Sequence, residues 1–222
     1  PIGRRRFGYM PEERGLYPKM KLAEQLVYLA RLHGLAPADA KRSTDELLAR
    51  LSLAERANDA IEKLSLGNQQ RAQIAAALVH EPDVLMLDEP FSGLDPMAVD
   101  VVAEVLAERA HRGIPVLFSS HQLDIVERLC DDLVIIADGT IRAAGSREAL
   151  REQHTTLRYQ LQVDGDAGWV REQPGIAVIE TDGGYALFDA ETPDAAQRVL
   201  EAAVARGGVS DFARQHPTLS QI

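Results

Sequence analysis

The chain has 222 residues, 45% hydrophobic and 26% charged, and its 34 acidic and 24 basic side chains leave a net charge of −10. This composition suffices for a buried core in one large domain or two small ones, and the acidic balance argues against non-specific nucleic-acid binding. The single cysteine, Cys130, excludes an internal disulfide and is typical of a reducing compartment; no apolar run is long enough to span a membrane.

The first predicted elements are three helices. Leucines recur at helical spacing over residues 22–32, and Gly34 follows them as a C-terminal stop. Pro37 begins a second helix with a leucine-rich inner face. Ser65 precedes a third helical run over residues 68–80, so we expect it to cap that helix.

Short apolar runs then alternate with helices. Val84–Leu87 and Val116–Phe118 are continuous apolar runs, which are typical of strands buried on both faces. Asp95-Pro96 begins the helix between them. A third strand is expected at Leu133–Ile136, turning at Asp138-Gly139 into a fourth. This order predicts a parallel sheet with helices packed on it.

The pattern changes after about residue 155, where a small α+β domain is expected. Residues 157–163 alternate between apolar and polar, as in a half-exposed strand. Residues 176–180 and 185–188 flank a Gly-Gly hairpin turn. An amphipathic helix over residues 195–206 is expected to turn Val199, Leu200 and Val204 inward, and a last strand at residues 209–212 completes this domain.

Residues that carry chemistry follow two of the predicted strands. Asp88 and Glu89 come directly after Val84–Leu87, at the sheet edge where open α/β folds bind ligands. In phosphoryl transfer Asp88 would hold Mg²⁺, directly or through water, and Glu89 would orient or deprotonate an attacking water. His121 follows the next strand and would lie along the same edge. Alternatively, the acids merely end a strand, and His121 is an ordinary surface side chain.

A second candidate site lies at the start of the third helix. Free backbone N–H groups and the helix dipole favour an anion there. The Ser65 hydroxyl can donate to a phosphate oxygen, and Gly67 allows the backbone to come close. The simpler alternative is that Ser65 only caps the helix.

Five segments resemble the motifs of ATP-binding-cassette (ABC) ATPases, in the order typical of that family. Leu64–Arg71 resembles the signature motif, and Leu85–Pro90 resembles the Walker B strand with its catalytic glutamate. Ser92–Pro96 resembles the D-loop, Ser119–His121 the switch histidine and Gly8–Glu13 the Q-loop region. The resemblance covers residues 1 to about 150. It implies a P-loop NTPase-like α/β fold, with a parallel sheet and a helical subdomain, incomplete at the N-terminus.

The resemblance also implies roles for single residues and two cofactors, ATP and Mg²⁺. Glu89 would be the general base, His121 would contact the γ-phosphate, and Asp88 would be the Mg²⁺ acid. Two such subunits sandwich two ATPs head to tail, so the signature residues would contact the nucleotide of the opposite subunit, and Asp95 would sit at the dimer seam. The implied nucleotide-binding residues are Ser65, Leu66, Gly67, Asn68, Asp95 and Glu12.

Glu12 and two signature positions depart from the family pattern. Glu12 stands where the family has a glutamine, and an ionised acid cannot donate a hydrogen bond. It can still serve as a metal ligand through water. Leu66 and Asn68 stand where the motif usually has Gly and Gln, but the backbone of Leu66 can still donate.

The expected organisation is a partial ABC ATPase domain over residues 1–154 and a small α+β domain over 155–222. The first would hold a helical subdomain at about 19–80 and the Walker B, D-loop and switch-histidine part at 81–154. The implied function is the ATP-hydrolysing subunit of a transporter, an exporter by resemblance. It would work beside transmembrane permease subunits and a second ATPase subunit, on the inner face of the cell membrane. Open alternatives are a non-transport ABC ATPase and a degenerate, partner-binding cassette.

A phosphate-binding loop is the family motif that the sequence does not contain. Nowhere do the 222 residues match G-x-x-x-x-G-K-[ST], whose amides and lysine cradle the phosphates. Because the family carries this loop upstream of the Q-loop, we expect Pro1 to be an internal residue of a longer protein. The chain by itself is then expected not to hydrolyse ATP.

Overall fold

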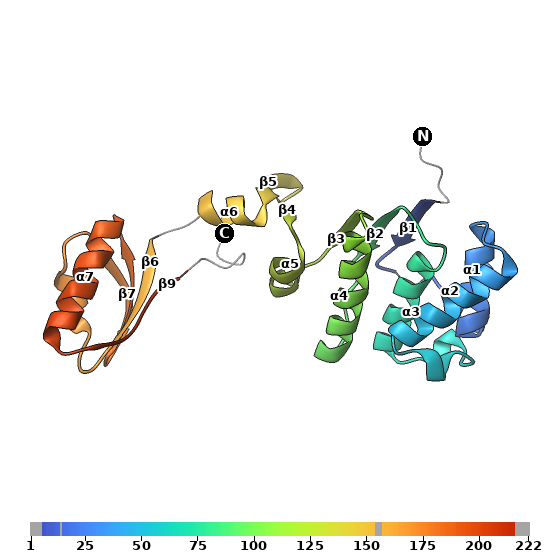
Figure 1. Cartoon of the computed structure of the whole chain (residues 1–222), viewed down its shortest axis with the longest axis horizontal. Coiled ribbons are helices and arrows are strands. Elements are labelled where there is room, and N and C mark those ends of the chain that lie inside the picture. Colours follow the sequence, from blue (N-terminus) through green and yellow to red (C-terminus); the bar gives the residue numbers. More distant parts are fainter. Residues whose placement is uncertain (1–5, 14, 154–156, 216–222) are drawn as a thin grey trace. The chain divides into compact units, whose positions relative to one another are not determined.

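The computed structural model describes residues 6–13, 15–153 and 157–215, which belong to two compact units, Pro1–Gln122 and Leu123–Ile222 (Figure 1). The domain boundary expected at residue 154 lies outside the described residues. The first unit contains the helices and parallel strands that carry Ser65, Asp88 and Glu89. The second contains a β-hairpin with two short helices, followed by a four-stranded sheet with one helix.

The three predicted helices of the first unit are present, and the third begins at Leu66 and ends at Leu78 instead of spanning 68–80. They are α1 (Leu22–Leu32), α2 (Pro37–Arg50) and α3 (Leu66–Leu78), with short 3₁₀ turns η2 (Ala54–Arg56) and η3 (Ile61–Lys63) between the last two. Each helix turns its apolar side inward, because burying that side removes it from water. The fully buried leucines and isoleucine of this cluster are Leu22, Leu26, Leu51, Leu53, Ile74 and Leu78.

A three-stranded parallel sheet forms the rest of the first unit. Its strands are β1 (Phe7–Met10), β2 (Val84–Asp88) and β3 (Val116–Ser119), in that order across the sheet. The helix α4 (Pro96–His111) connects β2 to β3, as expected from its Asp-Pro start. The connection from β1 to β2 passes through α3, and the connection from β2 to β3 passes through α4. Each leads to the neighbouring strand in the same direction across the sheet. Right-handed connections therefore place both helices on one face (Figure 1).

The sequence prediction that β2 and β3 are buried on both faces is wrong for this structure. Leu85 and Leu87 are buried on the face toward the helices. On the other face the register aligns Tyr9, Met86 and Leu117, which are 62%, 40% and 63% exposed. Both crossover helices lie on the first face, and no other described element of this unit covers the second.

The second unit begins with α5 (Leu123–Leu129), the hairpin of β4 (Asp132–Ala137) and β5 (Thr140–Ser146), and α6 (Arg147–Gln153). Asp138 and Gly139 both have positive φ, as a two-residue hairpin turn requires. We expected β4 to be a third strand of the parallel sheet. Among the described strands it pairs only with β5, antiparallel, because the tight turn brings that partner next to it.

The four-stranded sheet has the order β7-β8-β6-β9, with all neighbours antiparallel. Its elements are β6 (Arg158–Val163), η4 (Gly168–Glu172), β7 (Ile176–Asp182), β8 (Tyr185–Ala190), α7 (Pro193–Arg206) and β9 (Val209–Gln215). The first strand thus lies between the third and the fourth. This is the ferredoxin-like arrangement, with a 3₁₀ turn in place of the first helix.

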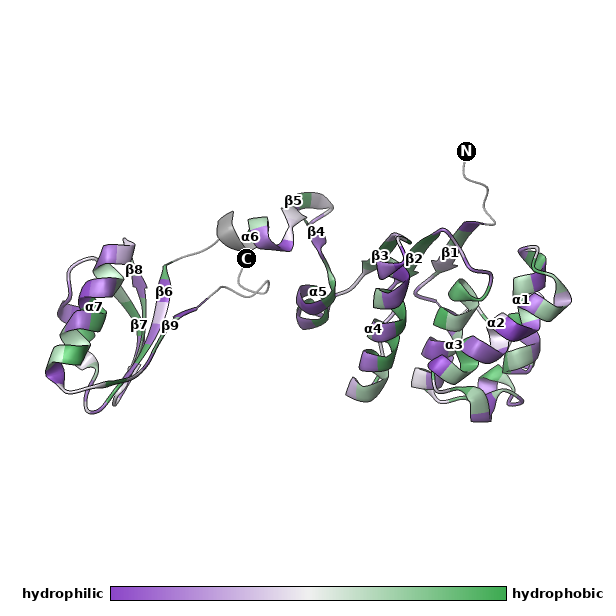
Figure 2. Cartoon of the chain, viewed as in Figure 1, coloured by the Kyte–Doolittle hydropathy of each residue, from purple (hydrophilic) through white to green (hydrophobic). Residues whose placement is uncertain are grey.

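The helix α7 packs on one face of this sheet and forms its core. Leu161, Phe188 and Val199 are fully buried there, together with residues of η4. Val204, which we expected to point inward, is exposed, and Ala203 faces the core instead. No helix in the described ranges has both the length and the apolar content to cross a membrane, and Figure 2 shows polar residues on each of them.

Candidate functional site

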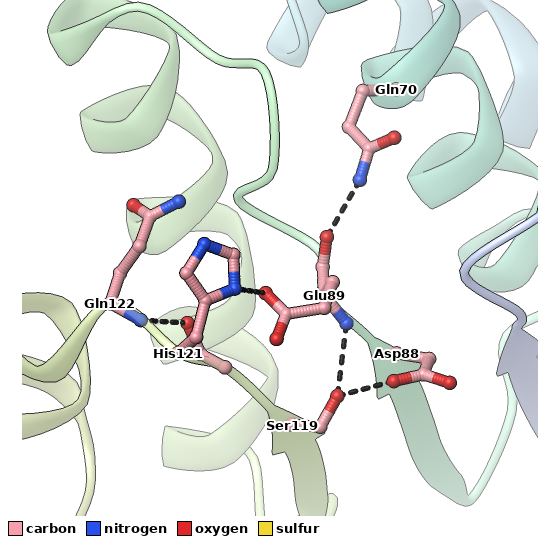
Figure 3. Close-up of polar contacts among 7 residues, drawn as sticks. Gln70, Asp88, Glu89, Ser119, His121 and Gln122 are labelled. Carbon is pink, nitrogen blue, oxygen red and sulfur yellow. Dashed lines mark hydrogen bonds and ion pairs between the residues drawn. The ribbon is translucent and has the colours of Figure 1, made fainter.

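The carboxyl edge of the parallel sheet brings three of the predicted residues together. Asp88 ends β2 and pairs in register with Ser119 at the end of β3, and the Ser119 hydroxyl donates a hydrogen bond to the Asp88 carboxylate (Figure 3). Glu89 directly follows Asp88, and His121 follows Ser119 by two residues. Asp88, Glu89 and His121 therefore lie at one edge, as the strand order predicts.

The Glu89 carboxylate and the His121 ring contact each other. Oε2 of Glu89 lies 3.0 Å from Nδ1 of His121, while the Glu89 side chain is 17% exposed and that of His121 is 71% exposed. Oε2 has almost no contact with solvent. The contact is an ion pair when the imidazole is protonated. Among the described residues Oε2 has no hydrogen-bond partner, so the approach of the His121 ring is an electrostatic contact.

The backbone of Glu89 has an uncommon conformation. Its φ is +47°, in the left-handed region that non-glycine residues seldom adopt. The Glu89 N–H donates to Ser119 Oγ at 3.1 Å, and its carbonyl accepts from Gln70 Nε2 at 2.8 Å (Figure 3). Such a conformation persists where neighbouring groups hold it, and it is frequent at functional sites.

The start of α3 carries the residues of the second candidate site. Ser65 is the N-cap, and its Oγ accepts from the backbone N–H of Asn68 at 3.3 Å. Ser65 and Leu66 are exposed, and Gly67 and Asn68 are half-buried. Asn68 Oδ1 accepts a hydrogen bond from Arg71 in the next turn. The capping interpretation of Ser65 is thus correct, and its hydroxyl proton still remains for a ligand.

Gly67 lies against the loop that follows Glu89. A Cβ atom at Gly67 would lie 3.4 Å from the carbonyl oxygen of Gly93, so a side chain there would crowd this loop. Asp95, at the end of the loop, caps α4 by accepting from the Ala98 N–H at 2.9 Å. The structure thus explains Asp95 as a helix cap, and its place at a dimer seam stays a prediction.

Glu12 lies in the loop after β1 and is exposed. Gln73 of α3 fixes the loop on both sides of it, because Nε2 donates to the carbonyls of Pro11 at 2.9 Å and Glu13 at 3.1 Å. Glu12 therefore has a defined backbone position beside α3. The described contacts do not place its side chain in the Asp88–His121 cluster.

The donor set at the sheet edge fits Mg²⁺ bound together with a nucleotide. Asp88 supplies a carboxylate, the oxygen ligand that Mg²⁺ prefers, and Mg²⁺ usually takes only one or two protein carboxylates besides water and phosphate oxygens. No group of three or more His, Cys, Asp or Glu residues within the described ranges could hold a metal alone. The chemistry of the site thus fits a metal that arrives with phosphates.

The sequence prediction gave no role to Gln70 or Ser119, although both bond to Glu89 or Asp88. The only signal for Gln70 is a polar side chain on the buried side of a helix, 4% exposed. For Ser119 it is the position opposite Asp88 in the register of the next strand, which requires the strand pairing to be known.

Comparisons with known proteins settle the family. The ABC transporter family matches residues 1–92, and the DrrA1-3-like C-terminal domain of ATP-binding proteins matches residues 145–222. An uncharacterised ABC transporter ATP-binding protein of Bacillus subtilis, YhaQ, is 35% identical over 98% of this chain and 73% of its own length. The chain belongs to the ABC transporter ATP-binding proteins.

Two further relatives agree with this assignment. An uncharacterised ABC transporter ATP-binding protein of Alkalihalophilus pseudofirmus is 37% identical over 97% of this chain and 80% of its own length. The linearmycin resistance ATP-binding protein LnrL of Bacillus subtilis is 36% identical over 66% of this chain and 47% of its own length.

Solved structures confirm the cassette fold. The ATP-binding subunit of an ABC transporter superposes with a TM-score of 0.63 at 36% identity, over 68% of this chain and 62% of that one. A dimeric ATP-binding cassette bound to ADP and phosphate superposes with a TM-score of 0.60 at 21% identity, over 65% of this chain and 64% of that one. The chain thus spans less than two thirds of each solved structure, and its sheet and helices belong to the P-loop NTPase fold of ABC ATPases.

Proposed function

We propose that this chain provides the general base, the Mg²⁺ acid and the signature residues of the ATP-hydrolysing subunit of an ABC exporter. The observation that carries this proposal is the 3.0 Å contact between Glu89 and His121, next to Asp88, at the carboxyl edge of a parallel sheet. Export as the direction is supported by the similarity to a linearmycin resistance protein and by the match to the DrrA-like C-terminal domain.

Each residue of the edge has one task in this proposal. Bound Mg-ATP supplies the phosphoryl group to be attacked and the positive charge that stabilises the leaving oxygens. Glu89 accepts the proton of the attacking water, and His121 orients its carboxylate through Oε2. Asp88, whose carboxylate accepts a hydrogen bond from the Ser119 hydroxyl, would hold the metal. The His121 ring, which is exposed apart from its contact with Glu89, would also contact the γ-phosphate.

Ser65, Leu66, Gly67 and Asn68 would bind a second nucleotide, held by another ATPase subunit. They belong to the start of α3, a different element from the sheet edge of Asp88 and Glu89. A head-to-tail pair of subunits brings such a helix start to the nucleotide of its neighbour, where the N–H groups meet phosphate oxygens. Asp95 would lie at the dimer seam, and Glu12 would lie near the metal-bound water.

A groove between α1 and α2 supports a permease as the membrane partner. It has a volume of about 790 Å³ and is lined by both helices, including the exposed apolar side chains of Tyr28 and Leu32. Apolar patches rimmed by charged groups, here Glu24, Arg31 and Lys41, are typical of protein interaction surfaces. The chain would then act on the cytoplasmic face of the membrane.

The test is ATP turnover by the transporter that contains this chain. Glu89→Gln removes the proton acceptor while it keeps the size of the side chain, so kcat is expected to fall at least 100-fold with nucleotide binding retained. Glu104→Gln, the same substitution on the exposed side of α4, is the matched control and should leave turnover unchanged. Normal turnover in the Glu89→Gln transporter would contradict the proposal.

The 222-residue chain by itself is proposed not to turn over Mg-ATP, because its sequence has no P-loop pattern to cradle the phosphates. Phosphate release measured with the purified chain should equal the background rate. Turnover that Glu89→Gln abolishes would instead mean that another element of the chain holds the phosphates.

A further inference from the structure

The conformation of Glu89 requires support from its surroundings. A φ of +47° on a residue with a long side chain costs free energy relative to the ordinary extended or helical regions. Left alone, the residue would relax to a negative φ and carry its carboxylate away from His121. Something in the fold must therefore hold the two peptide groups that flank its Cα.

Two side chains from different elements hold those peptide groups. Ser119 Oγ, at the end of β3, accepts from the Glu89 N–H at 3.1 Å and donates to the Asp88 carboxylate. Gln70 Nε2, from α3, donates to the Glu89 carbonyl at 2.8 Å (Figure 3). The same carbonyl also accepts from the Ser92 N–H at 3.1 Å, which closes the following turn.

We propose that Gln70 and Ser119 are positioning residues, which together fix the backbone of Glu89 so that its carboxylate meets the attacking water. The hydroxyl of Ser119 uses its proton for Asp88 and a lone pair for Glu89, so it places the metal acid and the base in one fixed relation. The inference rests on the proposed function in one respect, that Glu89 is the general base.

The position of Gln70 adds a link between the two candidate sites. Gln70 is buried on the same helix whose first turn carries the signature residues Ser65, Gly67 and Asn68. Through this bond the helix that carries Ser65 and Gly67 is connected directly to the Glu89 carbonyl. A buried side-chain bond to a backbone carbonyl also fixes the distance between the two elements.

The first test uses the isotope-labelled 222-residue chain without nucleotide. Ser119→Ala is expected to speed the solvent exchange of the Glu89 amide about tenfold, because the amide loses its hydrogen-bond acceptor. Gln70→Leu is expected to shift the backbone resonances of Glu89 away from left-handed values. Ser119→Thr keeps the hydroxyl and should restore slow exchange. Ser120→Ala, the same change at the next residue, should leave Glu89 unaffected, because Ser120 Oγ bonds to the Gln122 N–H.

The second test measures ATP turnover by the transporter that contains this chain. Gln70→Leu and Ser119→Ala should each lower kcat about tenfold and leave the KM for ATP within twofold, because a misplaced base slows the chemical step without removing nucleotide contacts. Ser119→Thr should recover most of kcat. A purely structural role would instead lower the amount of folded protein and leave kcat per folded subunit unchanged.

The outcomes separate this inference from the proposed function. Unchanged Glu89 exchange and resonances in both variants would overturn the positioning role, whatever the turnover. Normal kcat in Gln70→Leu and Ser119→Ala, with Glu89→Gln inactive, would overturn it as well and leave the proposed function standing. Normal turnover in Glu89→Gln would remove the proposed function and with it the catalytic meaning of the two bonds.

Discussion

His80, just after α3, is buried in a setting that disfavours its charged form. Its ring stacks on that of His33, with centroids 3.7 Å apart, and its Nε2 lies 3.0 Å from the Phe7 carbonyl. Burial, and then the neighbouring charge of His33, lower the pKa of His80 to about 4, although the bond to Phe7 acts in the opposite direction. The neutral imidazole is therefore part of the folded state.

This shift predicts how the stability of the first unit depends on pH. The unfolded chain binds a proton on His80 below its ordinary pKa of 6.5, whereas the folded chain does so only near 4. The contribution to stability is thus present above pH 6.5 and is lost as the pH falls through this window, by about 3 kcal/mol in all. His80→Gln should remove this part of the acid sensitivity. The measurement is the free energy of unfolding in urea at several pH values, followed by hydrogen exchange of the α3 amides.

His111→Gln is the control for that measurement, since His111 is an exposed histidine on α4. It should leave the pH profile of the wild-type chain unchanged. An equal difference between wild-type and His80→Gln stability at pH 7 and pH 4.5 would contradict the assignment.

Cys130 is a free, partly buried cysteine of the second unit. It packs beside Leu133 and Leu150, and burial raises the pKa of its thiol, with the charge of Asp131 acting in the same direction. Because the thiolate is the reactive form, a raised pKa lowers the reactivity of this thiol at neutral pH.

At the scale of elements, the close approach of α3 to β1 depends on a glycine. A Cβ atom at Gly8 would lie 2.3 Å from the backbone carbonyl of Ala77 and 2.6 Å from a methyl group of Leu85. Gly8→Ala is therefore expected to push the helix off the strand and to destabilise the first unit by about 2 kcal/mol. Hydrogen exchange of the β1 and α3 amides measures this loss.

Gly15→Ala is the matched control, because no atom of the described residues lies within 4 Å of a Cβ there and its φ is not positive. It should change stability by less than about 0.5 kcal/mol. A similar loss in both variants would mean that flexibility of the chain, and not the helix–strand contact, sets the effect.

Helix positions were predictable because their signals are local. Ser65, Asp95 and Thr192 each cap a helix by accepting the N–H three residues later, and the proline beside Asp95 fixes the first turn.

The exposed face of β2 was not predictable, because the pattern of a strand does not say which elements cover it. To predict the roles of Gln70 and Ser119, one must know the register of β2 against β3 and the packing of α3. The left-handed Glu89 likewise has no local signal, since nothing in Asp88-Glu89-Pro90 requires it.

At the scale of the whole molecule, the two units have separate cores. Phe188 and Val199 form part of one core in the second unit, whereas Leu26 and Ile74 belong to buried clusters of the first. A free energy of unfolding measured on the whole chain therefore has no single meaning. Trp169, the single tryptophan, packs against the core of the second unit, with the Arg206 guanidinium 4.4 Å from its ring centre.

Trp169 fluorescence thus reports the unfolding of the second unit alone. Phe188→Ala opens a cavity in that core and should lower the urea midpoint seen by fluorescence, at a cost of about 4 kcal/mol, while exchange of the α3 amides stays as in the wild type. Gly8→Ala should instead speed exchange of the α3 amides and leave the urea midpoint seen by fluorescence as in the wild type. If either substitution shifted both signals equally, the two units would unfold as one cooperative structure, and a contact between them would have to carry several kcal/mol. Separate shifts would mean that each unit keeps its fold when the other is destabilised, so the site at Asp88 and Glu89 is held by the first unit alone.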